Sequence, residues 1–149
     1  MSQANPYDAF IMDHIRNARN YRALANASHK ANGINPLCGD ELTVFVKVVR
    51  GRIKDATFQC ACCGISMASA SVMTEIVKSA KVADVKPLAS MFVAVLNGNA
   101  GAPAHGVDAA QLAILQAVRD MPGRNRCAAL PWLALEAALD GRPQAVSAG

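Results

Sequence analysis

The chain has 149 residues, a length that fits one domain with its own hydrophobic core. Apolar residues make up 52% and charged residues 17%, which is typical of a soluble globular protein. The net charge of +4 is spread along the chain, and no apolar run reaches membrane-spanning length, so we expect neither nucleic acid nor a membrane as a partner.

The first half of the chain predicts a helix followed by a hairpin. Residues 6–24 carry apolar side chains at helical spacing, whereas residues 25–35 are small and polar and fit a loop or a short edge strand. The β-branched residues of 41–50 predict a strand, Gly51 a hairpin turn, and 52–58 the returning strand.

The second half predicts helices, which would cover the hairpin. Their expected ranges are 65–80, 82–96, 108–119 and 127–139, with a loop at 97–106, a turn at 121–123 and a loose tail at 141–149. Strands followed by helices predict the α+β class, a small antiparallel sheet of about three strands with helices packed on one face. We expect residues 1–149 to form a single domain.

Five cysteines point to chemistry rather than to a disulfide framework. The N-terminal residues lack a signal-peptide pattern, so we expect a cytoplasmic protein, where thiols stay reduced. Cys60, Cys62 and Cys63 fall in the predicted turn between Phe58 and the helix that begins near Ile65. Cys63 directly precedes that helix, whose N-terminal dipole favours a thiolate.

Four residues could form one metal site. Cys38 and Cys63 flank the predicted hairpin, Asp40 lies two residues after Cys38, and Cys127 lies at the start of the last predicted helix. Three thiolates and one carboxylate suit zinc, or an iron–sulfur cluster with one non-thiolate ligand. The spacing contains no paired CxxC motif, so incidental buried cysteines stay an open alternative.

Three ordered motifs resemble those of a known family. They are Asn35-Pro-x-Cys-Gly-Asp40, Cys63-x-Ile-Ser-Met-Ala-Ser-Ala-Ser71 and Arg124-x-x-Cys127-x-x-Leu-x-Trp132. Together they resemble the iron–sulfur cluster assembly family of IscU, SufU and the NifU N-terminal domain. Within it the chain is most similar to SufU, because Arg126 replaces the histidine of IscU and residues 82–108 resemble the SufU insertion.

The resemblance implies an IscU/SufU-like fold and a role in iron–sulfur cluster biogenesis. It implies zinc held by Cys38, Asp40, Cys63 and Cys127, and a SufS-like cysteine desulfurase that hands persulfide sulfur to Cys127. On this interpretation the protein is at most a sulfurtransferase, with downstream iron–sulfur acceptor or scaffold proteins as further partners. The alternative is a scaffold that assembles and passes on a [2Fe-2S] cluster, and a purely structural zinc domain is a third hypothesis.

Several residues depart from the family pattern or have a simpler interpretation. Cys60 and Cys62 replace glycines and could be auxiliary ligands, although we favour Cys63 over Cys62 because it precedes the helix. Arg124 and Arg126 could lower the pKa of Cys127 or steer a partner. Three further features are interpreted as structural: His14 as a surface or partly packed histidine, the serines after Cys63 as small packing residues, and Pro131 as a first-turn proline.

Overall fold

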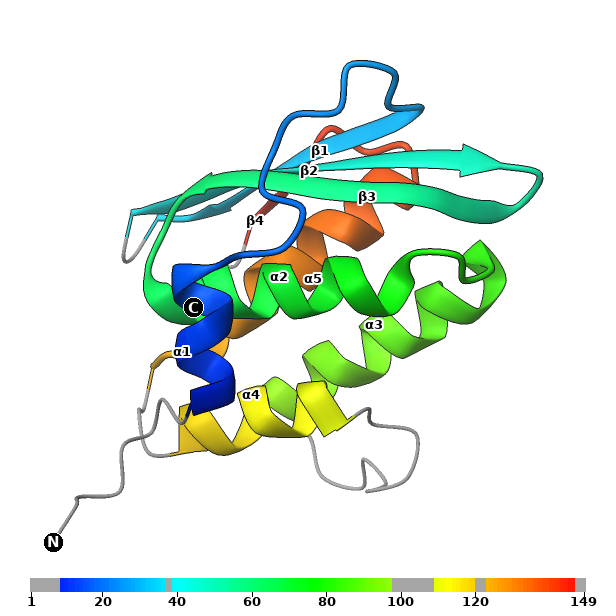
Figure 1. Ribbon diagram of the computed structural model, residues 1–149. Helices are drawn as coiled ribbons and strands as arrows, with labels where there is room; N and C mark the ends of the chain where they lie inside the picture. The colour runs from blue at the N-terminus through cyan, green and yellow to red at the C-terminus, as the bar shows by residue number, and fades with distance from the viewer. Residues whose placement is uncertain (1–8, 37–38, 98–108, 120–122, 147–149) are drawn as a thin grey trace, which may run out of the picture.

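The fold is a mixed β-sheet covered on one face by helices, as the computed structural model of the chain shows (Figure 1). The structure describes residues 9–36, 39–97, 109–119 and 123–146. Its elements in chain order are α1 (Ala9–Arg16), β1 (His29–Asn35), β2 (Asp40–Val49), β3 (Arg52–Ala61), α2 (Gly64–Val77), α3 (Val82–Leu96), α4 (Ala109–Arg119), α5 (Asn125–Leu139) and β4 (Gln144–Val146). The α+β class is therefore confirmed. None of the described helices is long and apolar enough to cross a membrane.

The predicted hairpin forms the centre of the sheet. β2 and β3 pair antiparallel, and Val49 lies opposite Arg52 across the turn. Arg50 and Gly51 both have positive φ, 54° and 76°, which is the backbone of the two-residue turn that matches the twist of a hairpin. Alternate residues of β2 are buried against the helices, as its hydrophobic pattern requires: Leu42, Val44 and Val46.

The sheet has one more strand than the sequence predicts. Its order is β3-β2-β1-β4, and the short β4 pairs parallel to β1, with Gly33 opposite Ala145. The Asn32 amide also donates to the Pro143 carbonyl at 2.9 Å. The prediction of a loose tail is therefore wrong for residues 144–146. Three residues are too few to show a strand pattern, and β4 forms because the edge of β1 offers unpaired backbone groups.

Helix α5 lies across the inner face of the sheet, close to β1. A Cβ atom at Gly33 would come within 3.2 Å of side-chain atoms of Leu130 and Ala134, so the missing side chain permits this close approach. The Trp132 ring is fully buried and packs edge-on against Phe92 of α3 with ring centroids 5.1 Å apart. The sheet, α3 and α5 thus share one core.

Serines on α2 join it to its neighbours. The Ser69 hydroxyl donates to the Ala128 carbonyl of α5 at 2.6 Å and accepts from Trp132 Nε1 at 3.1 Å. On another side of the helix, Ser71 accepts from the Arg19 backbone amide at 2.8 Å. These hydroxyls are buried, and each finds a partner on another segment. The small serines therefore permit close packing, as expected, and also hydrogen-bond across it.

The first helix is shorter than predicted. α1 ends at Arg16, and Asn20 has a φ of 61°, a left-handed conformation that a helix cannot contain. The chain then runs along the outer edge of β3, where the Phe58 amide donates to the Asn20 carbonyl at 3.1 Å. Pairing with β3 thus competes with continuation of the helix. The beginning of the predicted helix, residues 6–8, lies outside the described residues.

His14 is buried on α1, with its Nδ1 atom 2.6 Å from the Ser71 hydroxyl. Burial is the main cause that lowers its pKa below the ordinary 6.5, the Arg19 charge lowers it further, and Glu75 and Asp13 act in the opposite direction. No described ligand set includes His14. Of its two interpretations, a packed histidine rather than a surface one fits this environment.

We expect the free energy of unfolding to fall as the pH drops below 6.5, partly because of His14. The unfolded chain takes up a proton near the ordinary pKa, whereas the folded chain keeps this ring neutral, so the stabilisation is present above that pH and lost below it. Urea unfolding at a pH on either side of 6.5 measures the difference. His14→Gln should reduce the dependence on pH, and an unchanged dependence would contradict the assignment.

Candidate metal and sulfur site

Three of the four predicted ligands meet at one end of the sheet. Asp40 is the first residue of β2, Cys63 is the N-cap residue of α2, and Cys127 is the third residue of α5. One carboxylate oxygen and the two sulfur atoms all lie within 4.8 Å of one another. The return of the hairpin brings β2 and β3 together here, with Glu41 paired to Ala61. The structure therefore brings these three side chains together, and their binding of a metal stays a prediction.

The three side chains differ in exposure. Asp40 is 5% exposed and Cys127 is 2% exposed, whereas Cys63 is half-buried and gives the group its access to solvent. A buried carboxylate needs hydrogen-bond donors, and two are provided by the start of α2. The Cys63 amide donates to Asp40 Oδ1 at 3.2 Å, and the Ser66 hydroxyl donates to Oδ2 at 3.0 Å.

Ser66 connects all three residues. Its hydroxyl also lies 2.9 Å from the Cys127 carbonyl oxygen and 3.7 Å from the Cys63 sulfur. A hydroxyl has a single proton, so the Asp40 carboxylate and the Cys127 carbonyl share one donor. The sequence interpretation of Ser66 as a packing residue missed this contact. The available signal was its spacing, because a residue three positions after a helix N-cap lies on the same side of the first turn.

Pro131 explains why the Cys127 carbonyl is available to Ser66. In a regular helix the amide of residue 131 would donate to this carbonyl, but proline has no N–H. α5 begins at Asn125, so Pro131 stands in its second turn. The prediction of a first-turn proline is therefore wrong, because the helix begins two residues earlier than expected. The missing intrahelical bond is replaced by a bond from α2.

The environment of Cys63 favours its thiolate. A hydrogen bond from the Cys127 thiol is the main cause that lowers the pKa of Cys63, to about 5, and the Ser66 backbone amide and hydroxyl add to it. Burial and the Asp40 carboxylate oppose this shift. This environment therefore favours the thiolate of Cys63 at neutral pH.

The donor set fits a zinc ion. A thiolate and a carboxylate stand beside each other, and their repulsion raises the cost of ionising Cys63; a divalent cation would offset both charges. In a tetrahedral site with zinc–sulfur bonds of about 2.3 Å the sulfur atoms are roughly 3.8 Å apart. The observed separations of up to 4.8 Å would close to this value with side-chain adjustments of about 1 Å.

Two groups of predicted site residues lie outside this cluster. Cys60 and Cys62 form a disulfide in the structure, and Cys60 belongs to β3 rather than to the turn, because the strand continues to Ala61. They are not among the clustered ligand atoms of the described residues. Arg124 and Arg126 lie at the start of α5, respectively exposed and half-buried. Cys38 lies outside the described residues.

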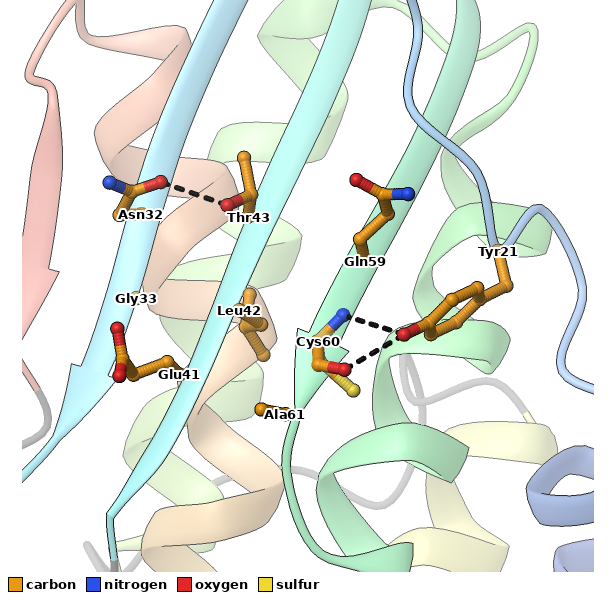
Figure 2. Close-up of a pocket in the computed structure, with 9 residues that line it drawn as sticks. All are labelled: Tyr21, Asn32, Gly33, Glu41, Leu42, Thr43, Gln59, Cys60 and Ala61. Carbon is orange, nitrogen blue, oxygen red and sulfur yellow. Dashed lines mark hydrogen bonds between the residues drawn. The ribbon is translucent and has the colours of Figure 1, made fainter.

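An open pocket lies next to the site, on the face of the sheet without helices (Figure 2). It is lined by side chains of all three long strands together with Tyr21. Cys60, one end of the disulfide, and Ala61 line its edge, four and three residues before α2 begins at Gly64. Asp40, Cys63 and Cys127 do not line this pocket, so this group of side chains reaches the solvent at a different place.

We expect Ser66→Ala to weaken zinc binding by roughly 10–100-fold, the usual cost of losing a group that orients a ligand. The substitution removes the donor to Asp40 and to the Cys127 carbonyl while leaving every ligand atom in place. Competition with a chromophoric chelator measures the affinity. Ser69→Ala, one turn along the same helix, is the matched control and should retain wild-type affinity; equal losses in both variants would contradict the role of Ser66.

The fold and the site define a small α+β domain that brings two cysteine side chains and a carboxylate together at one end of its sheet. The model of the NifU-like N-terminal domain matches residues 6–128, and the chain belongs to this family. It is 35% identical to the zinc-dependent sulfurtransferase SufU of Bacillus subtilis strain 168 over 87% of this chain and 86% of that protein. These findings confirm the family resemblance.

Two further comparisons agree with this. The chain is 30% identical to the iron–sulfur cluster assembly scaffold protein IscU of Thermotoga maritima, over 89% of this chain and 92% of that protein. A crystal structure from Fervidobacterium islandicum AW-1, described as an iron–sulfur cluster assembly scaffold for the SUF system, superposes with a TM-score of 0.81 at 27% identity. The superposition covers 93% of this chain and 99% of that one.

Proposed function

We propose that this protein serves iron–sulfur cluster biogenesis by accepting persulfide sulfur from a cysteine desulfurase at Cys127. The meeting of Asp40, Cys63 and Cys127 within 4.8 Å carries the proposal. Similarity over most of the chain to a protein named as a zinc-dependent sulfurtransferase supports it. The expected resident ion is zinc, held by these three residues and Cys38.

Chain geometry allows Cys38 to complete the ligand set. One residue, Gly39, separates it from Asp40, so their Cα atoms are at most about 7 Å apart. Asn35 pairs with Asp40 across the strands, which fixes both ends of the short connection that contains Cys38. A fourth ligand from this connection would give the closed, four-coordinate arrangement of a protein-bound zinc.

The residues support a simple transfer of sulfur. The Cys127 thiolate attacks the terminal sulfur of the persulfide on the desulfurase, the sulfur–sulfur bond of that persulfide breaks, and the desulfurase cysteine leaves as a thiolate. When bound, zinc would keep the ligand thiols deprotonated near neutral pH. Because Cys127 is only 2% exposed, the first turn of α5 has to move outward before a partner can reach its sulfur.

Asp40 is the ligand best suited to release. A carboxylate is a harder ligand than the thiolates around it, and soft sulfur ligands bind zinc more strongly in such a set. The Ser66 hydroxyl and the Cys63 amide already satisfy both Asp40 oxygens, so the carboxylate keeps hydrogen-bond partners when it leaves the metal. Departure of the Asp40 carboxylate from the metal would open a coordination position without unfolding the site.

The second candidate function is a scaffold that builds a [2Fe-2S] cluster and passes it to downstream proteins. The similarity to the Thermotoga maritima protein named as an IscU scaffold favours it. The same three residues would then be cluster ligands, since thiolates with one other ligand can hold such a cluster. Both candidates place the chain in iron–sulfur cluster assembly.

Metal analysis combined with a turnover assay separates the two. For a sulfur acceptor, the anaerobically purified chain should be colourless, contain about one zinc per chain, and raise the turnover of a SufS-type desulfurase supplied with cysteine. For a scaffold, anaerobic reconstitution should give a brown, oxygen-labile protein. A chain that binds neither zinc nor iron and leaves turnover unchanged would refute both.

A further inference from the structure

The disulfide between Cys60 and Cys62 is a redox pair that ends one residue before Cys63, a member of the proposed metal and sulfur site. Cys60 is near the end of β3, and Cys62 immediately precedes Cys63, the N-cap residue of α2. Consecutive Cα atoms are about 3.8 Å apart, so Cys62 adjoins the residue whose sulfur lies within 4.8 Å of the Cys127 sulfur. Neither cysteine of the pair belongs to the candidate ligand group of Asp40, Cys63 and Cys127.

Cys60 is fixed in place, whereas Cys62 lies beyond the end of the strand. The Tyr21 hydroxyl donates to the Cys60 carbonyl at 2.8 Å and accepts from the Cys60 amide at 3.2 Å, so it satisfies both backbone groups on the open edge of β3 (Figure 2). The Cys60 sulfur lies 4.0 Å from the Met67 sulfur in the second turn of α2. Cys62 belongs to neither a strand nor a helix. One thiol of the pair is thus anchored, and the other sits on a short connection.

A persulfide cannot yield sulfide without a reductant. Its terminal sulfur must gain two electrons, which two neighbouring thiols provide when they become a disulfide. We propose that the reduced Cys60/Cys62 pair releases sulfide from the persulfide carried by Cys127 and ends in the disulfide that the structure contains. This inference rests on the proposed function, since it requires Cys127 to have accepted sulfur.

The reaction balances in two exchanges. The Cys62 thiolate attacks the terminal sulfur of the Cys127 persulfide; that sulfur–sulfur bond breaks, Cys127 leaves as a thiolate and takes up the proton from Cys62, and Cys62 becomes the persulfide. The Cys60 thiolate then attacks the inner sulfur of Cys62, and hydrosulfide leaves with the proton from Cys60. One terminal sulfur is reduced by two electrons, and two thiols are oxidised to one disulfide. An external dithiol reductant regenerates the pair.

The placement of the pair suits this order of attack. Cys62 is next to the metal and sulfur site, so it is the thiol positioned to receive the terminal sulfur. Cys60 is held by Tyr21 at a fixed distance behind it, and the two residues already form a disulfide with Cα atoms 5.5 Å apart. The second exchange therefore needs no rearrangement of the strand.

A single-turnover experiment tests the inference. The full chain is reduced, freed of small thiols, and mixed anaerobically with a SufS-type desulfurase that has been loaded with persulfide and separated from free cysteine, with no other reductant present. We expect about one sulfide per chain by a methylene blue assay. Peptide mapping should find the Cys60–Cys62 disulfide formed in step with it. Cys60→Ser should release less than about a tenth as much sulfide and should accumulate persulfide instead, while Ala61→Ser, a similar change between the two cysteines, should behave as wild type.

The outcomes separate this inference from the proposed function. If the wild-type chain carries persulfide on Cys127 but releases no sulfide and forms no disulfide, the inference is overturned and the proposed function stands. If the disulfide forms while Cys60→Ser releases as much sulfide as wild type, the pair is structural and the inference is equally overturned. If no variant gains any sulfur from the desulfurase, the proposed function itself fails.

Discussion

Cys127→Ser is expected to reduce the turnover of a cysteine desulfurase to the level of the desulfurase alone. The hydroxyl that replaces the thiol is not ionised near neutral pH and does not form a persulfide. The same change removes a proposed metal ligand, so zinc affinity should fall by more than the roughly 10–100-fold that loss of a ligand-orienting group costs. Turnover with cysteine as substrate and chelator competition measure the two effects.

Whether Cys127→Ser stays folded distinguishes a sulfur acceptor from a purely structural zinc domain. Cys127 packs at the edge of the core, and serine is close to it in size, so the urea midpoint should change far less than the turnover. The wild-type chain stripped of metal is the control for stability. A variant that unfolds to the same extent as it loses activity would favour the structural interpretation, and a variant that still stimulates the desulfurase would refute the assignment of Cys127.

Trp132→Ala is expected to lower the free energy of unfolding by about 3–5 kcal/mol, the usual cost of removing a large buried ring. The ring is 0% exposed, it packs edge-on against Phe92, and its Nε1 atom donates to the Ser69 hydroxyl at 3.1 Å. Domains of this size have a total stability of about 5–15 kcal/mol, so the variant should be marginally folded. Urea or thermal unfolding monitored by circular dichroism measures the loss.

Trp132→Phe is the matched variant for this prediction. It retains an aromatic ring against Phe92 but cannot donate to Ser69, so the loss should be about 1–2 kcal/mol. Ser69 keeps its own bond to the Ala128 carbonyl in either variant. Equal losses for the alanine and phenylalanine variants would contradict the view that ring volume, rather than the indole N–H group, dominates the contribution of Trp132.

Local pattern predicted the central hairpin and most of the helices. The β-branched residues of β2 and the glycine at position 51 determine strand and turn by short-range sterics, and the α3 range agrees with its prediction. The placement of Asp40 near Cys63 also follows from local pattern, because a hairpin must return the chain to its starting point. These features need no knowledge of the remainder of the fold.

The features that were not predicted depend on contacts between distant segments. β4 exists because β1 has an open edge, and α1 ends early because residues near Asn20 pair with β3. The hydrogen bond of Ser66 with the Cys127 carbonyl depends on α5 lying against α2, and spacing within α2 indicates only that Ser66 lies near Cys63. The position of Pro131 relative to the helix start likewise depends on where tertiary packing begins α5. Such contacts between distant segments override the local conformational preferences of the chain.

The proline in α5 also has a consequence for how the chain can be altered. Exchanging Pro131 for alanine would return an amide donor to the Cys127 carbonyl, and the single Ser66 proton would then turn entirely to Asp40. Since loss of this donor is expected to weaken metal binding, a fully committed donor should hold the Asp40 carboxylate more firmly in its orientation. Mutation four positions beyond the acceptor cysteine could thereby adjust how readily the ion is released, with every coordinating atom left unchanged.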